Sequence, residues 1–336
     1  MNIRKILIPN KPHLDPIAAI YLLRKHGKEK FPGVERAEIV FWEHAKNPSE
    51  KEASDFEKEG GLMIDVGGGL FDHHGGKNSS ETSTSLVASH LGIENNPEVS
   101  ALLGYIREDD LEGLHNRYGD LAYIVKCMHK QNVPSAKVIE YIMLAIDFLQ
   151  LNQDEWHHVV KKEYEEKCKV VMVKRPKRKI KLGVIESDNV QVGNYGISVD
   201  NLSILIQKRS TGHIVILTNK HHRINLREIV GAIRKRELEL ADYGKPIDPK
   251  KLQFEGKNSL VPQWFFHRSL NAFMNGSDAL NKADPTKVPL EEIMNLVWYG
   301  ITAEISEYCD CDKGGEMCPF APYGFSKCEE RKNSPA

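Results

Sequence analysis

No stretch of this sequence approaches the roughly 20 consecutive apolar residues that a membrane-spanning helix needs. The chain also has no excess of one charge: it contains 46 lysines and arginines and 47 aspartates and glutamates, which gives a formal net charge of −1. A basic field over the whole surface is therefore excluded, although local basic patches are not. Residues 1–15 turn polar too early for the apolar part of a signal peptide, so we expect a cytoplasmic protein.

Cysteine is scarce, with six residues in the chain, of which Cys127 and Cys168 stand alone. The other four crowd the C-terminal tail, and in a reducing compartment such a cluster indicates a metal rather than disulfides. Four thiolates at this density are enough for a tetrahedral structural zinc site, which we favour over an iron–sulfur cluster or free thiols. The predicted ligands are Cys309, Cys311, Cys318 and Cys328.

The length of 336 residues exceeds the roughly 250 residues at which a single core usually stops growing, and it indicates two domains. Hydrophobic residues make up 40% and charged residues 28% of the chain, which is ordinary for a globular protein. This composition excludes a disordered, collagen-like or coiled-coil chain.

Short apolar runs alternate with helical patterns in the first part of the chain. The runs at 3–9, 37–43 and 61–66 predict strands of the kind that is buried in a parallel sheet. This alternation is typical of an α/β domain with a mainly parallel sheet, which we assign to residues 1–150. The helices between and after the strands are predicted at 16–25, 82–91, 97–108 and 119–130.

A long helical stretch at 135–170 leaves this domain, and its charged second half, 151–170, is predicted to be a connector. A smaller α/β domain with its own sheet follows at 171–300, and a Cys-rich tail at 301–336. The predicted strands of the second domain are at 170–173, 180–186, 197–199, 202–207 and 213–218, with helices at 224–238 and 288–308.

Three segments of the first domain place carboxylates and imidazoles at or just after the ends of predicted strands. His13 and Asp15 follow the first strand, Asp65 ends the third, and residues 72–74 (Asp-His-His) follow after a short turn. Open α/β sheets bind ligands at the carboxyl ends of their strands, where groups from different strands can converge. Carboxylates and imidazoles together suit a divalent metal such as Mn²⁺, and a metal pair can activate water for phosphoryl transfer.

Each element also has a simpler interpretation. Asp65 alone can be a strand-end cap, and Asp15 can cap a helix that starts at Pro16. Residues 67–69 (Gly-Gly-Gly) can be a flexible turn, and no GK[ST] follows to make them a phosphate loop. The pairs at 157–158 and 221–222 show that two adjacent histidines mean little by themselves. The joint pattern is harder to explain by coincidence.

The joint pattern resembles the DHH phosphoesterase superfamily, which includes RecJ-like exonucleases, oligoribonucleases and family II pyrophosphatases. Residues 72–74 match the motif that names the family, and 12–23 (PHLDPIAAIYLL) look like its first motif, with Asn10 where commoner members have a histidine. The His-x-Asp form and the run at 65–68 are closer to its Myg-type branch. The aspartate of the fourth motif falls within 105–113 (YIREDDLEG).

The resemblance implies a centre of two Mn²⁺ or Mg²⁺ ions, with Asp65 as the bridging ligand. It implies that His74 faces the scissile phosphate, as an electrostatic stabiliser or proton donor, and that Asp72 orients a histidine. The implied metal ligands are His13, Asp15, Asp65, His73 and, from the fourth motif, Asp109 or Asp110.

The second domain lacks the Gly-Gly-Gly-His loop with which members of the family often hold substrate, so other residues are expected to take that role. His267 and Arg268 are candidates for substrate binding, together with Asn10 of the first domain. The aromatic residues at 264–266 can stack a base or belong to the core.

Two basic stretches stand out in the otherwise neutral chain. The run at 174–181 can neutralise phosphates or guard a sheet edge with lysines. Arg223, Arg227 and Arg234 are spaced to share one helix face. Together the two stretches favour an anionic polymer or a nucleotide as substrate.

The sequence therefore predicts a metal-dependent phosphoesterase, which we interpret as an exonuclease that hydrolyses single-stranded or short oligonucleotides with metal-activated water. One alternative is hydrolysis of a small phosphate compound, such as a cyclic dinucleotide or pyrophosphate. Another is a DHH-like protein that binds nucleotide or nucleic acid without cutting it. No membrane partner is expected, and a homodimer is left open.

Overall fold

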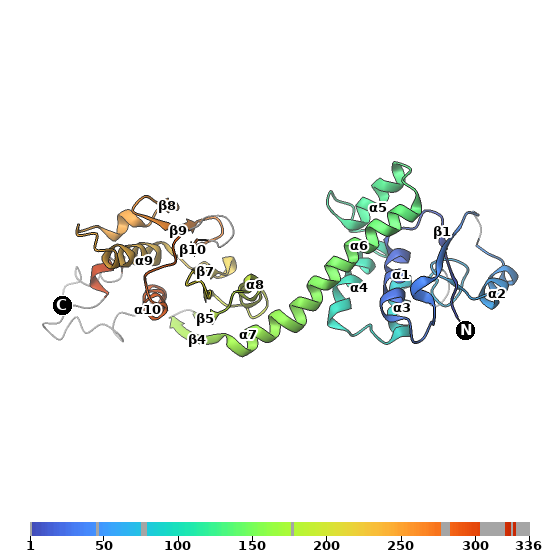
Figure 1. The fold of residues 1–336 in the computed structure, drawn as a ribbon, viewed down its shortest axis with the longest axis horizontal. Coiled ribbons are helices and arrows are strands. Elements are labelled where there is room, and N and C mark those ends of the chain that lie inside the picture. The colour runs from blue at the N-terminus through green and yellow to red at the C-terminus, as the bar shows by residue number, and fades with distance from the viewer. Residues whose placement is uncertain are drawn as a thin grey trace. The chain divides into compact units, whose positions relative to one another are not determined.

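A computed structural model describes residues 2–44, 47–74, 79–175, 178–276, 283–302, 320–323 and 325–326. The chain divides into a first unit, Met1–His157, and a second unit, His158–Ala336. The predicted α/β class is confirmed: the first unit has a three-stranded parallel sheet, and the second a mixed seven-stranded sheet (Figure 1). No helix of the described part of the chain is long and apolar enough to cross a membrane.

The sheet of the first unit consists of the three strands that the sequence predicts. Strand β1 (Lys5–Pro9) lies between β2 (Glu38–Trp42) and β3 (Gly61–Met63), and both pairings are parallel. The apolar centre of β1, residues 6–8, is buried on both faces, as the unbroken apolar run requires. All three strands therefore end at the same edge of the sheet.

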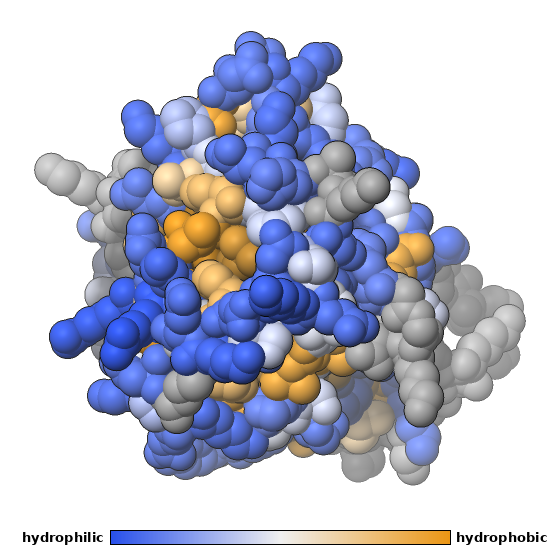
Figure 2. Space-filling view, turned by 90° about the vertical axis from the view of Figure 1, so that its right-hand side faces the viewer, coloured by the Kyte–Doolittle hydropathy of each residue, from blue (hydrophilic) through white to orange (hydrophobic). Residues whose placement is uncertain are grey.

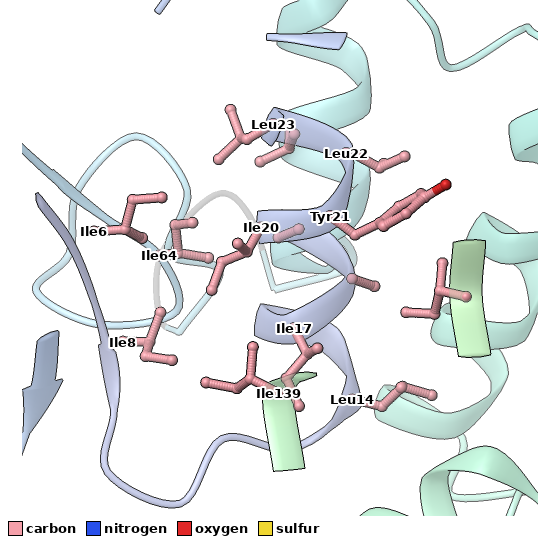
Figure 3. Packing of buried hydrophobic residues seen from close by; sticks show 14 of the residues in the cluster. Ile6, Ile8, Leu14, Ile17, Ile20, Tyr21, Leu22, Leu23, Ile64 and Ile139 are labelled. Atoms are coloured by element: carbon pink, nitrogen blue, oxygen red, sulfur yellow. The ribbon is translucent and has the colours of Figure 1, made fainter. Parts of the chain in front are cut away.

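Helix α1 (Leu14–His26) is the centre of the core of this unit. Every residue from Leu14 to Leu23 is buried, so the helix is enclosed on all sides and shows little amphipathic character. Figure 3 shows Ile6 and Ile64 of the sheet side facing Ile20 of α1. Around α1 pack α3 (Ser83–Leu91), α4 (Pro97–Asp110), α5 (Leu121–Lys130) and α6 (Ser135–Asp154).

Helix α2 (Glu50–Lys58) was not predicted from the sequence, because it is highly charged and has no apolar stripe. A capping box starts it, because Ser49 Oγ accepts from the Glu52 N–H and the Glu52 carboxylate accepts from the Ser49 N–H. Phe56 packs with Leu7 and Met63 on the second face of the sheet. Figure 2 shows apolar side chains gathered within a hydrophilic surface.

In the second unit, β5 (Arg178–Glu186) and β6 (Ile204–Lys208) are parallel, and the other neighbouring strands pair antiparallel. Residues 197–199 were predicted as a strand, but 197 and 198 are the last residues of α8 (Val190–Ser198) and Val199 follows it. Helix α8 forms the crossover that the parallel pair of β5 and β6 needs. The sheet has the order β4 (Lys169–Arg175), β5 (Arg178–Glu186), β6 (Ile204–Lys208), β7 (Ile214–Thr218), β10 (Ala272–Asn275), β9 (Val261–His267), β8 (Gly256–Asn258). The helices are α7 (Lys161–Lys167), α8 (Val190–Ser198), α9 (Arg227–Leu240) and α10 (Leu290–Ile301).

Two side chains that the sequence offered for substrate binding are core residues. Trp264 is fully buried and stacks on Phe273, with ring centroids 4.3 Å apart, and Phe266 is also buried. Strand alternation explains this, since residues 264 and 266 share the inward face of β9 and Phe265 lies on the other face. The interpretation that Trp264 or Phe266 stacks on a base is therefore wrong.

Arg234 likewise does not join a basic surface row. Its side chain is fully buried, and the guanidinium donates to the carbonyl oxygens of Leu252, Phe254 and Gly256 at 2.5–2.8 Å, and to that of Trp264 at 3.2 Å. Burial lowers the pKa of this group to about 10, so it stays protonated at neutral pH. These hydrogen bonds connect α9 to the segment 252–256 and to β9.

Candidate metal centre

His13 and Asp15 lie between the end of β1 and the first turn of α1. The Asp15 carboxylate accepts from the backbone N–H groups of Ser83 and Thr84, both at 2.8 Å. The Thr84 hydroxyl donates to the Asp15 carbonyl oxygen at 2.9 Å. Asp15 therefore caps α3, which comes from a distant part of the sequence, and not the helix in which it lies.

Asp65 follows β3 in the left-handed backbone conformation, with φ of 61°, which is uncommon for a residue other than glycine. Its side chain is buried, and its carboxylate accepts from the Ser83 hydroxyl at 3.2 Å. Its N–H donates to the Phe71 carbonyl oxygen, which closes the turn leading to residues 72–74. Strained backbone of this kind concentrates at functional sites.

Asp72 organises this turn. Its carboxylate accepts from the N–H groups of Gly68 at 2.7 Å and His74 at 3.0 Å, and it lies 2.9 Å from His74 Nδ1. With Nδ1 held by Asp72, the His74 ring is fixed in orientation while over half of the side chain stays exposed. This is the contact that an orienting role for Asp72 requires.

His73 lies at the centre of the cluster. Its Nε2 atom is 3.2 Å from Asp65 Oδ1, 3.3 Å from Asp110 Oδ2 and 3.9 Å from Asp15 Oδ2. Both His73 Nε2 and Asp110 Oδ2 are buried, yet neither makes a well-aligned hydrogen bond in the described part of the chain. Buried polar atoms without such a bond need another partner, and a cation surrounded by these oxygens and nitrogens meets that need.

The charges of the cluster also favour a cation. Burial opposes protonation of His13, but the hydrogen bond from its Nε2 to Asp110 at 2.9 Å and the charges of Asp65 and Asp15 outweigh it and raise its pKa to about 9. Burial, with the charge of Asp15, raises the pKa of Asp65 to about 6 despite the opposing effect of His13. Crowded carboxylates thus recruit protons in the metal-free protein, and a dication would replace them.

Three groups of side chains that lie wholly in the first unit bring ligand atoms within 4.8 Å of one another. They overlap, since Asp15, Asp65 and His73 each belong to two of them. These imidazoles and carboxylates form a candidate metal-binding centre. The groups are Asp65-His73-His74, His13-Asp15-Asp65 and Asp15-His73-Asp110.

Of the two aspartates that the fourth motif left open, Asp110 joins the cluster and Asp109 does not. Asp109 is buried elsewhere on α4, with Oδ1 3.5 Å from Lys126 Nζ. Successive residues of a helix point about 100° apart, so only one of the pair can face the cluster. Asn10 is exposed and also outside these groups, and its carbonyl oxygen accepts from the Ser135 hydroxyl.

His267 and Arg268 belong to the second unit, whereas the cluster lies wholly in the first. His267 ends β9 and Arg268 starts the exposed turn to β10. The tail cysteines 309, 311, 318 and 328 fall outside the described residues, as do the side chains of 174–178 within the basic run.

Sequence reasoning missed the part that Ser83 and Thr84 play in holding Asp15 and Asp65. The signal was present, because residues 82–85 (Thr-Ser-Thr-Ser) are four hydroxyl residues at a helix start, with Thr82 and Ser85 forming a capping box. From the sequence alone, this pattern indicates only that a helix begins at these residues. Which carboxylate would reach its N–H groups depends on tertiary packing.

Comparisons with known proteins give no family. No protein-family model matches this chain, and no curated protein matches it. A crystal structure of an uncharacterized protein from Helicobacter pylori G27 aligns over 88% of this chain and 99% of its own, at 10% identity and a TM-score of 0.24. Similarity at that level carries no argument about function.

Proposed function

We propose that this protein is a metal-dependent phosphoesterase, and more narrowly an exonuclease that acts on single-stranded or short oligonucleotides. The observation that supports it is the buried His73 Nε2 atom among three carboxylates, with His13 and the exposed His74 beside them. Imidazole–carboxylate centres that leave one face open to solvent suit phosphoryl transfer.

In this proposal His13, Asp15, Asp65, His73 and Asp110 would hold the metal, which would supply a bound water of lowered pKa and neutralise charge on the phosphate. Asp72 holds His74 Nδ1, so Nε2 is left to face a phosphate oxygen. From there His74 stabilises developing negative charge or gives a proton to the leaving oxygen. Ser83 and Thr84 keep two of the carboxylates in place.

Asp110 and Asp109 offer a matched test, because they are neighbours on α4 and differ only in what they face. We expect Asp110→Asn to lower Mn²⁺-dependent release of nucleotides from a labelled single-stranded oligonucleotide by about 100-fold or more, the range seen when an electrostatic group of an active site is removed. Asp109→Asn should retain activity within about threefold, since it removes only a contact with Lys126. The assay is run with Mn²⁺ and again with a chelator.

Three results would count against the proposal. The wild-type protein could release no nucleotide with Mn²⁺ or Mg²⁺, or keep its activity in the chelator. The two variants could also lose activity equally, which would indicate a structural effect of α4. Turnover of a cyclic dinucleotide or pyrophosphate without oligonucleotide cleavage would keep the phosphoesterase and reject the exonuclease.

A further inference from the structure

Two loops of the second unit meet at one end of its sheet. Strand β10 pairs with β7, so the turn before β10, residues 268–271, lies beside the segment that follows β7. Asn271 joins them: its side-chain amide donates to Thr218 Oγ1 at 2.7 Å and to the Ile224 carbonyl oxygen at 2.6 Å. The Thr218 hydroxyl donates back to the Asn271 carbonyl oxygen at 2.7 Å. Sequence reasoning treated these segments separately, and the structure makes them one surface.

This surface, which we call the basic end, carries four exposed cations, namely Lys220, Arg223, Arg227 and Arg268. Residues 218–227 and 267–271 contain no aspartate or glutamate, although the whole chain is nearly neutral. Within the described residues, none of the four cations forms an ion pair. The positive charge of the basic end is therefore not neutralised by its own loops.

The backbone of the basic end is held in a defined shape. Arg223 and Asn271 both adopt the left-handed conformation, with φ of 49° and 50°. Beside them, His222 Nδ1 lies 2.7 Å from Ser203 Oγ, which ties the loop after β7 to the start of β6. The 14-residue helix α9 also starts here, at Arg227, and its N-terminal dipole adds to the positive potential.

Two carboxylates on neighbouring segments have partners other than these four cations. Asp200 forms an ion pair with Lys181 and accepts from the Tyr164 hydroxyl, and Glu228 accepts from the Ser326 N–H. Neither forms an ion pair with the four cations in the part of the chain that the structure describes. A ligand with several negative charges at successive points could pair with all four.

We infer that the basic end is a binding surface for the phosphodiester backbone of a single-stranded oligonucleotide. Cations spread over two loops neutralise successive phosphates of a polymer, whereas a lone phosphate is held by donors that converge in one pocket. The exposed imidazole of His221 and the half-exposed ring of His267 lie on the same loops, where they can stack on unpaired bases. The inference rests on the proposed function for the identity of the polyanion, and it makes the second unit a source of affinity independent of metal.

The test measures binding without cleavage. Full-length protein carrying Asp65→Asn is titrated in a chelator against a fluorescent single-stranded 12-mer, and anisotropy is followed over a series of salt concentrations. We expect binding that weakens steeply with salt. Adding Arg223→Glu and Arg268→Glu should lower the affinity at least tenfold and reduce the salt slope by about 1.4, since each lost phosphate contact is worth about 0.7 on a single strand.

A matched control changes the net charge equally at another place in the same unit. Lys245 follows the C-terminal end of α9, and the partly exposed Lys208 ends β6 opposite Ile214, at the other end of the sheet from Thr218. Lys245→Glu with Lys208→Glu should leave affinity and salt slope within about twofold of the Asp65→Asn protein, because the local field falls off within about 10 Å.

The inference is overturned if the Asp65→Asn protein does not bind the 12-mer, if the Arg223 and Arg268 changes leave affinity intact, or if the control pair weakens binding as much. Failure of the proposed function gives a different pattern, with salt-dependent binding at the basic end but no metal-dependent cleavage by the wild-type protein. In an active enzyme, the two arginine changes should raise KM for oligonucleotides and leave kcat unchanged.

Discussion

Asp65→Asn is expected to lower metal-dependent hydrolysis about a thousandfold or more, while the protein without metal becomes no less stable. Asparagine tolerates the left-handed backbone of Asp65 and can still accept from the Ser83 hydroxyl, so the turn is kept. What is lost is the carboxylate that His13, His73 and His74 surround at 3.2–3.6 Å. A centre without it binds a dication weakly.

The stability effect has a defined pH dependence. Burial raises the pKa of Asp65 from its ordinary value of 3.8 to about 6, so the ionised carboxylate disfavours the folded state at neutral pH. The advantage of Asp65→Asn in a chelator should therefore appear as pH rises from about 4 to 6 and stay constant above. Thermal unfolding at pH 5 and pH 7 checks this, and Mn²⁺ should raise the Tm of the wild type only. A variant that unfolds below the wild-type Tm in the chelator, or one that keeps its Mn²⁺ shift, would contradict this account.

Arg234→Met is expected to destabilise the second unit by about 3 kcal/mol or more, because a buried carbonyl left without a donor costs roughly 1–3 kcal/mol and Arg234 serves four. Methionine fills similar space, so cavity formation contributes little. Urea unfolding followed by the emission of Trp264, which is buried beside this group, reports on that unit.

Arg236→Met on the same helix is the control. Arg236 is partly exposed and pairs with Glu292 at 2.6 Å, an interaction at the surface that is worth less than about 1 kcal/mol. Equal destabilisation by both changes would show that the carbonyl contacts of Arg234 do not hold α9 in place. Since other tryptophans of the chain also emit, the transition is compared with far-ultraviolet circular dichroism.

The parts of the fold that the sequence predicted are those where burial and periodicity coincide. The strands β1, β2 and β3 were unbroken apolar runs, so their place in a parallel sheet followed from composition alone. Helix α2 was missed because its start depends on the Ser49 capping box, and its apolar content is little more than Ala53 and Phe56. The end of α8 was read as a strand because Ile197 and Val199 are β-branched residues, which are common in strands.

The candidate site was likewise predicted only in part from the sequence. His13, Asp15, Asp65 and His73 could be brought together in advance because parallel strands end at one edge. The choice between Asp109 and Asp110 could not, since it depends on the rotation of α4 about its axis. The burial of Arg234 could not be predicted either. The spacing of arginines on a helix shows which residues share a face, but not whether that face is exposed to solvent.

The bonds from α3 to Asp15 have a consequence for the kinetics of ion capture. Because Ser83 and Thr84 fix this carboxylate as the chain folds, the entropy of ordering it is lost before any ion arrives. The donor atoms need little rearrangement, so a cation could enter about as fast as it sheds its hydration water. Without the hydrogen bonds between Asp15 and α3, the ligand side chains would have to be ordered when the ion binds.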